Sequence, residues 1–214
     1  MFGVTADYPI NEKWDFSLYN INGFSYLAEP NEVFSYGTRL IWRPIGALTV
    51  MQNLYYGPEQ DETSLEFWCL FSDSIVEWKG EQGTLALILN AGTEKQADVP
   101  GTPRFLWMGS ALEAGWHISG SLSVAFRPEF YWDPGGLILG REPLIRAITT
   151  TLEYKFWIIS PLNSLIRLEY QFDKSTGSGG GFFKGGEIRP GMNGLTPSQH
   201  LLVLGFIWWF DHEP

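Results

Sequence analysis

Short and long connections alternate along this chain, and the alternation constrains its fold more than any single motif does. Period-2 segments are separated by Gly, Pro, Asn and Asp throughout the sequence. Tight turns are expected at 10–13, 44–45, 79–82, 117–118 and 160–163. Longer polar connections are expected at 22–33, 58–64, 91–104, 134–142 and 174–196. A membrane barrel has brief turns at one end and long loops at the other, whereas a Greek-key sandwich has no reason to sort its loops this way.

The strands themselves have the lengths that a membrane barrel needs. We expect them at about 2–9, 13–21, 34–43, 46–57, 65–77, 83–92, 105–116, 119–132, 143–158, 164–174 and 197–210. Several exceed the ~5–6 residues usual in globular proteins and match the ~9–11 needed to cross a bilayer at a tilt. No run approaches the ~18 apolar residues of a transmembrane helix. The sequence predicts an all-β fold, an antiparallel up-and-down transmembrane β-barrel, with 1–214 as a single barrel domain.

Aromatic residues support the same fold class. They make up 16% of the chain, and Trp208, Trp209 and Phe210 stand near its end. Such a cluster invites aggregation in a soluble protein, but membrane barrels carry aromatic girdles at both interfaces. The predicted interface aromatics are Trp42, Tyr56, Trp116, Trp132, Phe156, Trp208 and Phe210.

The strand count predicts an incomplete barrel. A bacterial single-chain barrel has an even number of strands with both termini in the periplasm, whereas we count eleven. We therefore expect that an N-terminal strand is missing, merged in our count or supplied by another chain. The segment 1–8 also lacks the basic and apolar regions of a signal peptide, which predicts a processed or truncated chain.

Charged residues share one parity on the C-terminal strands. In 122–132, 148–156 and 166–173, apolar side chains take the even positions and most charges take the odd positions. This alternation suits a wet lumen, and it also suits the solvated outer face of a sandwich. The predicted pore-lining residues are Arg39, Arg43, Asn53, Glu113, Arg127, Glu129, Glu153, Lys155, Arg167, Glu169 and Asp173, with Asp7 as a further candidate.

Two strands do not show which face is which. Strands 65–77 and 83–92 are ambiguous, because Phe67–Phe71 is apolar at both parities. A strand here could pack against an inward plug or a neighbouring subunit, or the alternation could slip at a bulge.

No catalytic or metal-binding motif stands out. His117, His200 and His212 lie far apart, and the single cysteine, Cys69, is expected to be a small apolar filler. The glycine-rich segment 177–186 lacks phosphate-loop spacing and is expected to be a flexible external loop. Acidic residues near 59–62 are expected to be solvated loop charges. We predict no enzyme activity, no cofactor and no metal, and the net charge of −10 makes nucleic acid an improbable partner.

Several segments resemble a known family. The hairpin 34–50, followed by 53–59, is similar to the repeated hairpin of the OmpL-like β-barrel porin family. Segments 126–136 and 165–173 resemble that family's penultimate strands, and the last strand resembles its closing strand. The resemblance implies a Gram-negative outer-membrane pore for passive diffusion of small solutes. Family members are longer, so the chain looks like their C-terminal portion.

Three functions remain open from the sequence. The favoured one is an outer-membrane porin, a diffusion channel for small hydrophilic solutes or ions. The second is a structural barrel or sheath in a multi-protein outer-membrane assembly, for example around an electron-transfer conduit. The third is a soluble sandwich that binds carbohydrate through exposed Trp. The expected partners are outer-membrane lipid and, if the wall is shared, a second copy of the chain or another envelope protein.

Overall fold

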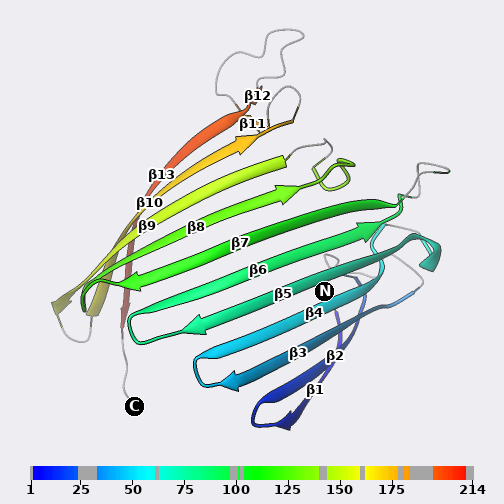
Figure 1. Ribbon diagram of the computed structural model, residues 1–214, viewed down its shortest axis with the longest axis horizontal. Coiled ribbons are helices and arrows are strands. Elements are labelled where there is room, and N and C mark those ends of the chain that lie inside the picture. The colour runs from blue at the N-terminus through cyan, green and yellow to red at the C-terminus, as the bar shows by residue number, and fades with distance from the viewer. Residues whose placement is uncertain are drawn as a thin grey trace. The chain divides into compact units, whose positions relative to one another are not determined.

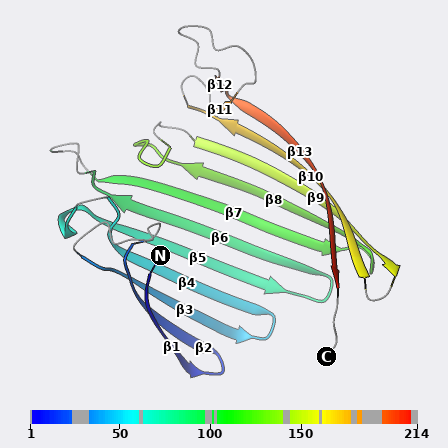
Figure 2. The same ribbon diagram turned by 180° about the vertical axis from the view of Figure 1, so that it is seen from behind.

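The fold is dominated by one β-sheet whose strands follow the order of the sequence (Figures 1 and 2). The computed structural model describes residues 2–23, 33–60, 63–96, 101, 104–139, 144–159, 162–177, 181–183 and 195–210. The 11-stranded sheet consists of β1 (Gly3–Asn11), β2 (Trp14–Ile21), β3 (Ser35–Ile45), β4 (Leu48–Pro58), β5 (Trp68–Lys79), β6 (Gly83–Glu94), β7 (Phe105–His117), β8 (Leu122–Trp132), β9 (Leu144–Ile159), β10 (Leu162–Ser175) and β13 (Ser198–Phe210).

The predicted all-β, antiparallel fold class is confirmed. Every pairing with a described register is antiparallel, from β1–β2 to β10–β13. Within the described residues the sheet is not closed, since its strand order begins with β1 and ends with β13. A separate two-stranded ribbon joins β11 (Phe182–Phe183) to β12 (Leu195–Thr196), inside the connection 174–196 that was predicted to be long and polar.

No helix among the described residues has the length and apolarity required to span a bilayer.

Several predicted boundaries are wrong, and three of them have a clear local reason. Residues Leu65–Phe67 form the 3-10 helix η1 instead of strand, because the Ser64 side chain accepts from the Glu66 amide and caps the turn. Pro44 and Ile45 belong to β3, and the turn lies at 46–47, because Ile45 pairs with Leu48. The segment 118–121 is a turn in which Ser119 Oγ accepts from the amides of Ser121 and Leu122, so β8 begins at Leu122.

The chain divides into two compact units, each with its own set of contacts. Unit 1 comprises 1–78, 87–110 and 131–142. Its buried cluster contains Ile21, Tyr55, Cys69 and Trp107, and the partly buried side chains packed against it are Tyr19, Phe71, Tyr131 and Leu137. Cys69 is therefore a buried apolar filler, as predicted.

The buried cluster resolves the two ambiguous strands. Phe71 packs against the cluster together with Cys69, while Leu70 and Val76 point to the other face and are exposed. On β6, Leu87 and Leu89 are exposed, whereas Asn90 bonds to the side chain of Asp73. Phe67–Phe71 looked apolar at both parities because one of its faces packs into this cluster.

Unit 2 comprises 79–86, 111–130 and 143–214 and contains the best-defined register of the sheet. Leu168 of β10 lies between Leu152 of β9 and Leu204 of β13, which forms one row across three strands. The neighbouring row, on the opposite face, places Arg167 between Glu153 and Gly205. The two faces of this unit therefore differ sharply in polarity.

The backbone of Gly92 lies close to the ring of Trp107, and this contact allows a test of the packing in unit 1. A Cβ added at Gly92 would overlap the ring of the buried Trp107. We expect Gly92→Ala to lower the free energy of unfolding by about 1–3 kcal/mol, because the Trp107 ring would have to leave its place in the buried cluster. Thermal unfolding in detergent measures the loss. Gly46→Ala is the control, since an added Cβ there meets nothing within 4 Å, and equal midpoints for the two variants would contradict the packing.

Candidate functional site

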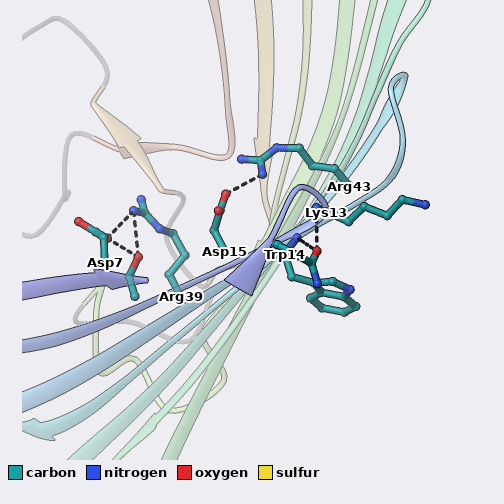
Figure 3. A network of polar contacts seen from close by, with 8 residues as sticks. Asp7, Lys13, Trp14, Asp15, Arg39 and Arg43 are labelled. Atoms are coloured by element: carbon teal, nitrogen blue, oxygen red, sulfur yellow. Dashed lines mark hydrogen bonds and ion pairs between the residues drawn. The ribbon is translucent and has the colours of Figure 1, made fainter. Parts of the chain in front are cut away.

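A row of polar side chains crosses the first strands of unit 1. The register aligns Asp7 of β1 with Ser17 of β2, Arg39 of β3 and Asn53 of β4. Ser17 Oγ donates to Asp7 Oδ1 at 2.5 Å, and an Arg39 amino group lies 3.6 Å from the same oxygen. Figure 3 shows Asp7 and Arg39 pointing toward one another on one side of the strands. We call the side of unit 1 that carries this row its polar face.

The same row continues onto β5 and β6 through an acceptor that the sequence did not single out. Asp73 lies opposite Asn53 in the β4–β5 register. Its two carboxylate oxygens accept from the Nδ2 groups of Asn53 and Asn90, each at 2.8 Å. Charge-assisted hydrogen bonds of this kind are stronger than neutral ones, so Asp73 fixes three neighbouring strands in register.

A second ion pair lies nearer the short turns of unit 1. Arg43 of β3 contacts Asp15 of β2 at 2.6 Å, and both side chains are partly exposed. In Figure 3 the Trp14 ring extends to the opposite side of the hairpin from this pair. There Trp14 stacks on Trp42, with ring centroids 5.3 Å apart. Charged and aromatic side chains of neighbouring residues are thus sorted to opposite faces.

The charged residues of unit 2 surround a cavity of about 250 Å³. Arg127 of β8 contacts Glu129 at 2.8 Å and Glu113 of β7 at 3.9 Å. Arg167 of β10 contacts Glu153 of β9 at 2.5 Å. Thr151 Oγ1 donates to Glu169 at 3.1 Å. The cavity is lined by acids, arginines and threonines together with Ala114, Ala125 and Phe126, and its charged and hydroxyl groups suit water and small polar solutes.

Two predicted lining residues have other surroundings. Asp173 is only 2% exposed and accepts from Gln171 at 2.7 Å and from Gln199 at 2.6 Å, so it is a hydrogen-bonded anchor of β10 and β13. Lys155 is exposed and lies opposite Leu165, and it has no acidic partner among the residues that the structure describes. Neither residue joins the ion pairs around the cavity.

A second cavity, of about 280 Å³, lies in unit 1 where long connections follow the strands. Its lining is largely aromatic and apolar, with two carboxylates: Tyr55, Glu59, Cys69, Phe71, Glu94, Trp107 and Ile138. Ile138 belongs to a turn organised by Asp133, which is 0% exposed and accepts from the amides of Leu137, Ile138 and Leu139. The turn thereby places apolar side chains over the buried cluster.

Arg104 holds the start of β7 beside this cavity. Its guanidinium lies over the Trp68 ring, 3.2 Å from the centroid, and donates to the carbonyls of Trp68 and Thr93. Desolvation lowers the pKa of this guanidinium, while nearby Cys69 and Glu94 act in the opposite direction. Arg104 thus ties the start of β5 and the end of β6 to the start of β7.

Sequence reasoning missed Ser17, Asp73, Asn90, Thr151 and the two glutamines that hold Asp173. Parity carried a signal for Asp73, which shares its face with Phe71 and Cys69, but those apolar neighbours concealed it. Only the register brings Asp73 to Asn53 and Asn90.

Five of the six predicted interface aromatics whose side chains are described lie on exposed strand surface. Trp116, Trp132 and Trp208 are exposed, as are Trp42 and Tyr56, and Tyr56 lies against Trp68. Phe156 is partly buried between Tyr154 and Phe206. The side chain of Phe210 lies outside the described residues.

Metal-ligating groups do not gather in the described part of the chain, where no three His, Cys, Asp or Glu side chains come together. His117 contacts Ser123 at 2.9 Å, and His200 contacts the Tyr170 hydroxyl at 2.8 Å. His212 and the acids Asp61 and Glu62 lie outside the described residues.

A comparison with protein-family models identifies the family of the chain. The family model described as "Putative beta-barrel porin-2, OmpL-like" matches residues 1–210. The chain belongs to this family. No curated protein matches the chain. The resemblance found in the hairpin 34–50 and in the last strands is therefore confirmed over nearly the whole sequence.

Cysteine labelling tests the assignment of faces in β10. In a Cys69→Ala background, we expect Glu169→Cys and Gln171→Cys to react with a charged, membrane-impermeant thiol reagent in lipid vesicles. We expect Leu168→Cys and Tyr170→Cys to be protected. Leu168 is 42% exposed in the chain itself, so its protection would have to come from lipid. Equal reaction rates at positions 168 and 169 would contradict the assignment.

Proposed function

We propose that the chain forms the wall of an outer-membrane pore through which small hydrophilic solutes or ions diffuse. The ion-paired, amide-rich side chains of each unit line the water-filled passage, and the apolar faces meet lipid. No chemical step is involved, since a porin acts through the radius and the charge of its passage. Membership of a β-barrel porin family supports this proposal.

The observation that carries the proposal is the exposure of the apolar face. In unit 2, Leu202 and Leu204 are 69% and 75% exposed, and Leu152, Ile166, Leu168 and Phe206 are exposed beside them. A soluble sandwich would bury this face and leave the charged face in water. Here both faces are open, which suits a sheet with lipid on one side and water on the other.

The mixed charge of the polar side chains in each unit favours weak ion selectivity. Arg39 pairs with Asp7, Arg43 with Asp15, and Arg167 with Glu153, so cations and anions alternate over short distances. Glu169 accepts from a threonine and leaves one negative charge beside these pairs. We therefore propose a mild preference for cations.

Planar-bilayer conductance of the detergent-purified chain tests the pore. We expect discrete ohmic steps with a slightly cation-selective reversal potential in a salt gradient. Glu129→Gln with Glu169→Gln should shift that potential toward anions, because Arg127 loses its 2.8 Å partner and Glu169 loses its charge. Glu12→Gln, in the exposed β1–β2 turn, is the matched control. An unchanged reversal potential in the double variant would show that neither Glu129 nor Glu169 lines the passage.

A structural role in a shared wall is the second candidate, and β13 favours it. Leu201, Val203 and Ile207 are exposed on the face of β13 that the register aligns with Gln171, Glu169 and Leu165. Together with Leu202 and Leu204 they make β13 apolar on both faces, as strands covered on both sides are.

Gel mobility separates the two candidates. A chain that closes its own barrel should migrate as a compact monomer until it is heated. A chain that shares its wall should instead migrate as an oligomer before heating, or should gain resistance to heat only when a second chain is added. Membrane-inserted samples that never conduct and never form a compact monomer would support the shared wall over the pore.

A further inference from the structure

Two basic side chains face each other directly at one end of the apolar face of unit 2. The β9–β10 register pairs Arg146 with Lys174, and the β10–β13 register pairs Lys174 with Ser198. Both basic side chains are exposed. They lie at the end of these strands where the connections are long, since β10 ends at Ser175 and β13 begins at Ser198.

The pair belongs to the apolar face of unit 2 and not to the opposite, charged face, which carries Arg127 and Arg167. Strand alternation puts Arg146 on the side of Ile148 and Leu152, and Lys174 on the side of Phe172 and Leu168. The row next to the pair is Ile148, Phe172 and His200, in which the His200 ring packs on Phe172 with centroids 4.8 Å apart. Further rows toward the short turn are mostly apolar, with Thr150 and Ser164 as their polar members.

Like charges placed opposite each other across two strands destabilise a sheet unless an anion compensates them. No acidic side chain pairs with Arg146 or Lys174 in the described part of the chain. On the charged face, by contrast, Arg127 and Arg167 each contact a glutamate. Among its described residues, unit 2 therefore supplies acidic partners for these two arginines and supplies none for the pair at the edge of the apolar face.

The depth of the pair corresponds to the polar boundary of a bilayer. From Ile148 to Phe156 the exposed side of β9 spans eight residue steps, or roughly 26 Å of strand at ~3.3 Å each. A tilt of ~40° reduces this to roughly 20 Å along the membrane normal, close to the ~25 Å apolar band of outer-membrane barrels. Arg146 and Lys174 come one row beyond this band, at the level of lipid headgroups.

We propose that Arg146 and Lys174 form a binding site for the phosphate of an outer-leaflet lipid headgroup, with the acyl chains lying along the apolar rows below. A guanidinium and an ammonium side by side can each donate to phosphate oxygens. The Ser198 hydroxyl opposite Lys174 is a further donor at the same level. This proposal rests on the proposed function in one respect, because it requires the apolar face to contact lipid. It does not require the chain to conduct ions.

Native mass spectrometry of the whole chain, released from phosphatidylcholine nanodiscs titrated with lipid A, measures the binding. We expect Arg146→Gln with Lys174→Gln to weaken lipid A binding about tenfold or more, because both charges that attract the phosphate are lost. The control Lys13→Gln removes an exposed cation from the β1–β2 turn and should bind like the unaltered chain. Arg146→Lys with Lys174→Arg should retain most of the binding.

Two further arms identify the source of the phosphate. Dephosphorylated lipid A should bind the unaltered chain and the double variant equally weakly. Inorganic phosphate at millimolar concentration should displace little lipid A. Equal lipid A affinity in the double variant and in Lys13→Gln would overturn the proposal, and so would tight binding of inorganic phosphate alone, which would indicate a site for a free anion. If the chain binds lipid A as expected but shows no conductance, the proposed pore function fails while the proposed lipid site stands.

Discussion

Antiparallel register is the constraint on which both faces of the sheet depend. In β9, β10 and β13 it aligns Arg167 with Glu153 and, one residue away, Leu168 with Leu152 and Leu204. A slip of one residue would move Arg167 to the apolar face and Leu168 to the charged one. The 2.5 Å contact between Arg167 and Glu153 therefore does more than add a modest energy, since it selects the register in which the apolar rows are also complete.

The polar contacts on the charged face are consistent with water nearby. Most of its ion pairs are partly exposed, so each contributes little energy, and removing water from them would cost more than their attraction returns. Asp173 and Asp133 are buried instead, and each is satisfied by amide donors. Charges with charged partners thus lie where solvent can reach them, and the buried acids hold the backbone and the ends of strands.

Strand positions and faces could be predicted from the sequence because alternation is a local property. All eleven expected strands are present in the sheet, including the two whose faces were ambiguous. What could not be predicted depends on contacts between distant segments. Asp73 resembles an isolated acid in an apolar strand until the register brings it to Asn53 and Asn90. Asp133 resembles a loop acid until three amides turn toward it. Local side-chain caps, such as Ser64 at η1, shifted the boundaries that parity alone had placed.

The distribution of basic residues links the proposed pore to the proposed lipid site. A chain with a net charge of −10 has acidic groups to spare, yet the direct cross-strand neighbour of Arg146 is Lys174. Such a pair costs more in hydrocarbon than in water, and it costs least in a place where an external anion approaches it. The boundary of the apolar face is such a place in a membrane that carries lipid phosphates. The apolar rows and the cation pair then position the sheet along the membrane normal together, which sets the depth at which the charged face meets water.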